Sequence, residues 1–87
     1  MVLKNYHCHV YFTANQADQA QVLLGGIEAE FGLERGRFHT APIGPHIGGS
    51  CQVLFQRDDL GPLVAWLMAN RNGLTCFIHG VTGDDLV

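Results

Sequence analysis

A short run near the amino end of the chain constrains the fold more than any other feature. Residues 6–12, YHCHVYF, are apolar or aromatic apart from two histidines, a composition typical of a β-strand. Side chains alternate between the two faces of a strand, so His7, His9 and Tyr11 share one face and the residues between them share the other. A sheet built on this run therefore has one apolar face and one face that carries imidazoles.

The composition indicates one small domain with few charges. The chain has 87 residues, of which 47% are hydrophobic and 15% charged, so residues 1–87 are expected to form a single domain around one core. Five cationic side chains against eight acidic ones provide no basic stripe, which argues against nucleic-acid binding. A surface this poor in charge predicts a homodimer, in which a second copy of the chain covers part of it.

The sequence shows no membrane-directing segment. No apolar run reaches the roughly 20 residues of a membrane-spanning helix, and the amino end lacks a signal-peptide pattern. Three cysteines, an odd number without paired spacing, indicate a reducing compartment. The expected location is cytoplasmic, without a membrane partner.

Hydrophobic periodicity predicts six elements in the order βαββαβ. Helices are expected between Thr13 and Gly32 and between Asp59 and Gly73. With right-handed crossovers, this order gives an α+β, ferredoxin-like fold, in which a four-stranded antiparallel sheet carries both helices on one face. The four strands are expected at about residues 4–12, 36–43, 51–56 and 74–79.

The same alternation sorts the histidines and the cysteines onto opposite faces of this sheet. The three cysteines are expected on the helix side, as buried small hydrophobic side chains without a disulfide. The first and fourth strands are neighbours in this fold, so His79 is expected close to His7 and His9. The face away from the helices is predicted to carry His7, His9, Tyr11, Arg37, His39, Gln52, Gln56, Thr75, Phe77 and His79.

Imidazole is the commonest metal ligand in proteins, so this convergence predicts a metal site. The alternative is a group of hydrogen-bonded surface or interface histidines. The rigid loop Gly44-Pro45-His46 either presents His46 over the sheet or is an ordinary loop. Arg37 could hold a substrate carboxylate through its planar fork of donors.

Four segments of the chain resemble the DOPA dioxygenase family, in its small fungal and bacterial type. They are residues 6–12, 36–46, 51–53 and 66–79, which run through nearly the whole chain in the family's order. The stretch from His39 to His46 and the approach to His79 through residues 70–74 are the most specific parts. The resemblance implies a ferredoxin-like, often dimeric domain that cleaves L-DOPA or a related catechol at an extradiol bond, with O₂ and non-haem Fe(II) or another divalent metal.

The resemblance assigns roles to side chains of the predicted sheet face and its neighbouring loop. The family's recurring histidines match His9, His39, His46 and His79. His7 matches the usual first histidine of the family's His-x-His pair. A general acid/base is then expected among them, to move a catechol proton. The expected roles are metal binding for His9, His46 and His79, catalysis for His39 and His7 (which is also the main substitute as a ligand), and substrate binding for Arg37 and Tyr11.

The sequence departs from the family in two places, and other functions stay open. The family usually has His-Pro where this chain has His79-Gly80, and it continues into an Asp-His pair that this sequence does not reach, as if truncated. A site of two histidines and one carboxylate would recruit Asp84 or Asp85. The alternatives are a non-catalytic dimeric domain that binds a small aromatic or a metal, and a zinc-dependent hydrolytic site.

Overall fold

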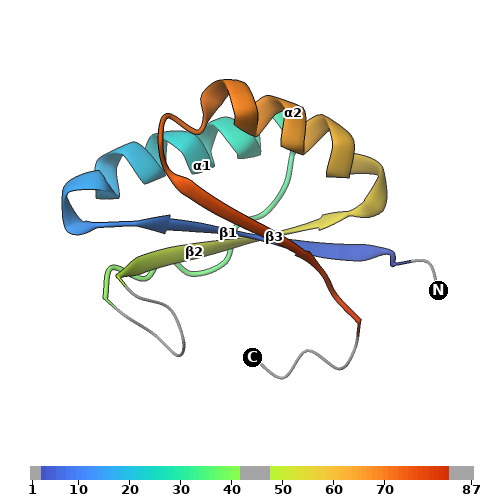
Figure 1. The fold of residues 1–87 in the computed structure, drawn as a ribbon, viewed down its shortest axis with the longest axis horizontal. Coiled ribbons are helices and arrows are strands. Elements are labelled where there is room, and N and C mark those ends of the chain that lie inside the picture. Colours follow the sequence, from blue (N-terminus) through green and yellow to red (C-terminus); the bar gives the residue numbers. More distant parts are fainter. Residues whose placement is uncertain (1–2, 42–47, 83–87) are drawn as a thin grey trace.

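The computed structural model describes residues 3–41 and 48–82 as one sheet covered by two helices (Figure 1). Both helices lie on the same side of the sheet, and the other side faces away from them (Figure 1). No helix in these two ranges is both long enough and apolar enough to cross a membrane. The elements are β1 (Asn5–Phe12), α1 (Ala17–Phe31), β2 (Gly49–Gln56), α2 (Leu60–Asn70) and β3 (Thr75–Gly80), with short 3₁₀ turns at Ala14–Gln16 and Arg57–Asp59.

The sheet is antiparallel throughout, and its strand order is β2-β1-β3. Because β1 is central, its register with both neighbours decides which side chains stand side by side. His7 lies opposite Leu54 on β2 and opposite His79 on β3. His9 likewise lies opposite Gln52 and Phe77. The predicted meeting of the first and last strands is therefore confirmed.

The prediction of four strands is wrong, because residues 36–41 form no strand. Two isolated bridges stand there instead, Arg35 with Val53 and His39 with Ser50. From Arg35 to His39 the segment has one residue more than β2 has between their partners, Val53 and Ser50. An extra residue on one side interrupts the hydrogen bonding between two strands, as it does in a β-bulge. The segment still follows the outer edge of β2, where Gly36 N–H donates to the Gln52 carbonyl at 2.7 Å. The α+β architecture thus remains compatible with a ferredoxin-like fold.

The core lies between the sheet and the helices, on the face that the alternation of β1 predicts. Cys8 and Val10 are fully buried there, and the apolar stripe of α1 packs over them. The ring of Trp66 rests against Gly26, at a distance that leaves no room for a side chain. The buried apolar residues are Cys8, Val10, Phe12, Ala20, Leu23, Leu24, Ile27, Cys51, Val53, Phe55, Leu63, Leu67 and Leu74.

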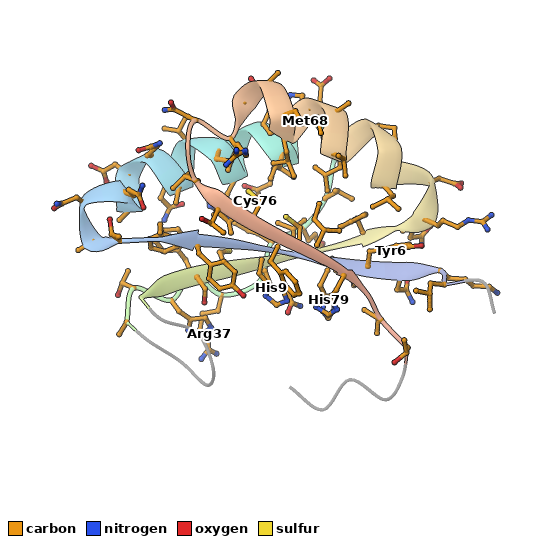
Figure 2. The ribbon with its side chains drawn as sticks, viewed as in Figure 1. Tyr6, His9, Arg37, Met68, Cys76 and His79 are labelled. Atoms are coloured by element: carbon orange, nitrogen blue, oxygen red, sulfur yellow. The ribbon has the colours of Figure 1, made fainter. Side chains whose placement is uncertain are left out.

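The three cysteines are free, as predicted, and none of them lies on the face away from the helices. Cys8 and Cys51 are buried, and Cys76 is half-buried on the helix side of β3 (Figure 2). A hydrogen bond with Cys76 and burial both raise the pKa of the Cys8 thiol. Burial also raises the pKa of Cys51. Both thiols therefore stay protonated at neutral pH and act as small apolar side chains.

Two valines test the assignment of faces, because one is in the core and one is on the surface. Val53 is 1% exposed on the helix side of β2, whereas Val22 is 77% exposed on α1. We expect Val53→Ala to lower the free energy of unfolding by about 2–3 kcal/mol, through lost burial and a small cavity. Val22→Ala should change it by less than about 0.5 kcal/mol, since alanine favours helices. Urea denaturation measures both, and equal losses would contradict the assignment.

Candidate functional site

The sheet face away from the helices, called the open face below, gathers histidines from β1 and β3. Figure 2 shows His9 and His79 on this face, opposite the side that bears Cys76 and Met68. His7 shares their face because it lies two positions from His9 on β1 and directly opposite His79. The histidine cluster consists of His7, His9 and His79, and it has the placement that strand alternation predicts.

The ring nitrogens of the cluster lie close together. Each of the three residues offers one nitrogen, and these nitrogens lie within 4.8 Å of one another. The Nε2 atoms of His9 and His79 are 3.1 Å apart, and the two rings are stacked at an interplanar angle of 6°. The ring of His7 stands nearly perpendicular to both, at 85° to His9 and 87° to His79. The third nitrogen therefore approaches from a different direction.

The hydrogen bonds of the cluster determine where its protons lie. His79 Nδ1 is 3.1 Å from the Gly80 carbonyl, which can only accept, so this nitrogen carries the proton and donates it. In the neutral ring, His79 Nε2 then accepts a hydrogen bond from His9 Nε2–H. A cation needs the lone pair of each nitrogen, so binding requires His9 to release this proton or to carry it on Nδ1.

Two aromatic side chains extend the stacked rings on the open face. Tyr11 stacks on His9 with ring centroids 6.2 Å apart, and Phe77 stacks on His79 at 5.4 Å. Burial raises the pKa of the Tyr11 phenol, with a smaller contribution from Cys8, so the hydroxyl stays protonated at neutral pH. The site thus combines three nitrogen donors with a row of rings and a neutral hydroxyl.

The cluster fits a divalent transition metal. Two nitrogens bound at about 2.0–2.1 Å to one ion, at roughly a right angle, stand about 3 Å apart. The His9–His79 nitrogen separation of 3.1 Å meets this requirement without rearrangement of the strands. The His79 hydrogen bond to a backbone carbonyl is the outer contact that orients ligating imidazoles in metal sites. Imidazole suits iron, zinc, copper and nickel, so Fe(II) is among the ions that these residues can hold.

The other predicted site residues do not join the cluster in the described part of the chain. His39 is half-buried beside Ser50 at the outer edge of β2. Two strand spacings of about 4.8 Å and two residues of about 3.4 Å place its Cα about 12 Å from that of His9. Arg37 is exposed, on the same side of the sheet as His9 (Figure 2). The remaining candidates, His46, Asp84 and Asp85, lie outside the described residues.

Comparison with known proteins identifies the family of this chain. Residues 6–87 match the Dopa 4,5-dioxygenase family. The chain belongs to this family. A solved crystal structure, that of a Nostoc punctiforme protein proposed to be a dioxygenase, is 41% identical to this chain and superimposes on it with a TM-score of 0.89. That match covers 94% of this chain and 71% of the Nostoc chain.

Two curated relatives of this Dopa 4,5-dioxygenase family chain come from fungi. A DOPA 4,5-dioxygenase of Amanita muscaria is 27% identical, over 97% of this chain and 41% of that protein. A 21.2 kDa protein of Botryotinia fuckeliana, without an assigned function, is 36% identical over 92% of this chain and 46% of that protein. The chain thus spans less than half the length of these two relatives.

Removing one imidazole should distinguish the cluster from His39 at the outer edge of β2. We expect His79→Ala to weaken Zn(II) or Fe(II) binding by more than about 100-fold, because loss of an outer contact alone costs about 10–100-fold. His39→Ala should leave the affinity within about threefold, since its Cα lies about 12 Å from that of His9. Calorimetric titration under anaerobic conditions measures both affinities. A large loss in His39→Ala, or none in His79→Ala, would exclude this cluster as the metal centre.

Proposed function

We propose that this member of the Dopa 4,5-dioxygenase family is an extradiol ring-cleaving enzyme. Its substrate would be L-DOPA or a related catechol, its co-substrate O₂, and its cofactor non-haem Fe(II). The convergence of three imidazole nitrogens within 4.8 Å on one sheet face is the observation that supports this function most directly. Family membership adds support for dioxygenase chemistry at the level of the family.

In this proposal, the histidine cluster holds the iron. Bound iron(II) would supply Lewis acidity toward the catechol and O₂. His79 keeps its ring orientation through the bond from Nδ1 to the Gly80 carbonyl, and His9 presents Nε2 once that atom has lost its proton. His7 contributes from the perpendicular direction. His46, a ligand expected from the sequence, remains a further candidate ligand.

The residues around the cluster position the catechol and move its protons. Tyr11 and Phe77 offer aromatic surface beside the imidazoles, against which a catechol ring can stack. His39 acts as general acid/base on a substrate hydroxyl in this proposal, and its position at the outer edge of β2, outside the cluster, leaves it free of a ligand role. Arg37, exposed on the same side of the sheet, binds a substrate carboxylate.

Anaerobic reconstitution with Fe(II), followed by L-DOPA and then air, tests the proposed reaction. We expect a yellow muconate-semialdehyde chromophore and the uptake of about one O₂ per catechol, because extradiol cleavage inserts both oxygen atoms. The His79→Ala variant, mixed with the same amount of iron, serves as the control for chemistry by free metal. Tight catechol binding without O₂ uptake would contradict catalysis and would favour a non-catalytic binding domain.

We also propose that a second copy of the chain covers the open face in a homodimer. Leu54 and Phe77 are each 52% exposed on this face, and exposed apolar surface costs about 25 cal/mol per Å². Light scattering at micromolar concentration should give about twice the chain mass. Phe77→Asp should give a monomer, since a buried unpaired carboxylate is strongly unfavourable. A monomeric wild-type protein would contradict this arrangement.

A further inference from the structure

The candidate metal centre takes its nitrogen donors from only two of the three strands. His7 and His9 lie on β1 and His79 on β3, so β2 contributes no imidazole to the cluster. The register nevertheless places two β2 residues directly beside it, Gln52 opposite His9 and Leu54 opposite His7. A ligand that occupies the β2 side of the centre therefore meets one amide and one aliphatic side chain.

The Gln52 amide is available to bind such a ligand. The hydrogen bonds of Gln52 within the described ranges involve its backbone carbonyl, which accepts from Gly36 N–H at 2.7 Å and from the Cys51 thiol at 3.9 Å. No side chain of a described residue bonds its amide. The residue is half-buried, so this amide is partly shielded from water, and a hydrogen bond from a ligand would compensate for the lost hydration.

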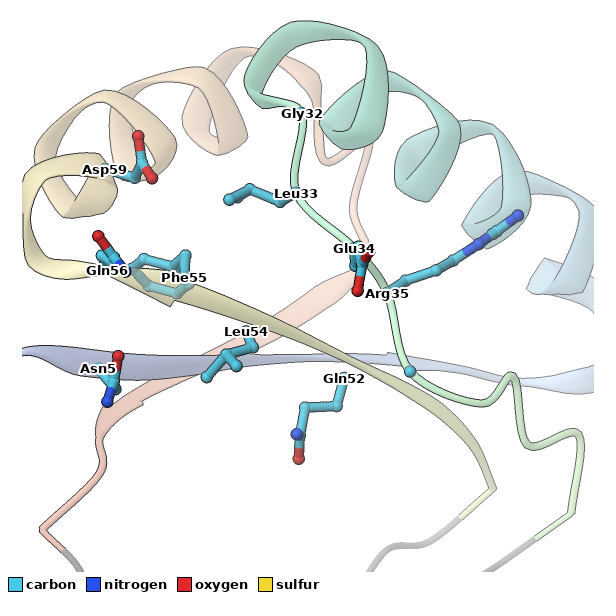
Figure 3. Close-up of a pocket in the computed structure, with 11 residues that line it drawn as sticks. Asn5, Gly32, Leu33, Glu34, Arg35, Gln52, Leu54, Phe55, Gln56 and Asp59 are labelled. Atoms are coloured by element: carbon cyan, nitrogen blue, oxygen red, sulfur yellow. The ribbon is translucent and has the colours of Figure 1, made fainter.

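The surroundings of Gln52 also leave space for a ligand. Gln52 and Leu54 line a groove of about 460 Å³ along the outer edge of β2 (Figure 3). In that view Gln52 points away from the helices, whereas Phe55 points toward them. The groove lies where the expected second strand is interrupted, between β2 and the segment that contains Arg35 and Gly36. A group bound at His9 can therefore extend over Gln52 toward this groove.

We propose that Gln52 is a substrate-binding residue that donates a hydrogen bond from its amide to an oxygen of the catechol held at the histidine cluster. The proposal deepens the function proposed above and rests on it. Gln52 stands between His9, its partner across the strands, and His39, which pairs with Ser50 two residues earlier on β2. A catechol oxygen that becomes anionic accepts a stronger hydrogen bond than a neutral one, so the amide favours the deprotonated ligand.

Titration of the Fe(II)-loaded protein with 4-nitrocatechol in the absence of O₂ tests this role without turnover. Gln52→Met keeps the length of the side chain and removes its hydrogen-bonding groups. We expect it to weaken nitrocatechol binding by about 10- to 100-fold, the effect of losing a hydrogen bond to a charged group. Gln52→Glu replaces the donors by a negative charge and should weaken binding at least as much. The absorbance of the bound nitrocatechol reports each affinity.

Gln56→Met provides the matched control. Gln56 lies on the same face of β2, opposite Asn5 and four residues beyond Gln52, which is about 13 Å along a strand. The Gln56→Met variant should bind nitrocatechol within about twofold of the wild-type affinity. Both methionine variants should bind Fe(II) with the wild-type affinity. Equal nitrocatechol affinities in the Gln52 and Gln56 variants would overturn the proposed role of Gln52 and would leave the proposed function unaffected. Failure of the wild-type Fe(II) protein to bind nitrocatechol would overturn the proposed function as well.

Discussion

The alternation of side chains along β1 is the constraint on which both the core and the candidate site depend. β1 is paired on both edges, so a shift of one residue in either ladder would exchange the residues of its two faces. Such a shift would expose Val10 and Phe12, which are buried, and would carry His9 into the core. Each of these apolar side chains contributes about 1.5–3 kcal/mol through burial. Hydrophobic packing on one face therefore holds the imidazoles in register on the other.

The features that follow from this alternation could be predicted from the sequence. Side-chain alternation along a strand and the order of the elements are enough to predict that His7 and His9 share one face. The same information predicts the burial of Cys8 and Cys51. The interruption of the expected second strand could not be predicted, because the extra residue between Arg35 and His39 results from how the backbone pairs with β2. Hydrophobic periodicity carries no information about such a slip.

The sequence predicts that His7, His9 and His79 converge, but it does not predict how each ring takes part in the cluster. The sequence predicts His7 mainly as a catalytic residue and as a substitute ligand, whereas its ring stands in the cluster with His9 and His79. The reason is the register between β1 and β3, which sets His7 directly opposite His79. These strands are far apart in the chain, and strand alternation fixes a face without fixing a partner. Gln52 is a similar case, because only the pairing with His9 distinguishes it from Gln56.

The imidazoles of the cluster are only partly shielded from water, because His9 is buried whereas His7 and His79 are half-buried. Water weakens the electrostatic interactions of the exposed parts of such a site. Enclosure strengthens such interactions and excludes side reactions, so a functional site on this face benefits from a cover. The exposed apolar side chains indicate where a cover would lie. Phe77 stands beside His9 on β3 and Leu54 beside His7 on β2, at opposite corners of the cluster. Any surface that packs on both Phe77 and Leu54 must also cover the imidazoles between them. Burial of these two side chains would therefore enclose the candidate metal centre.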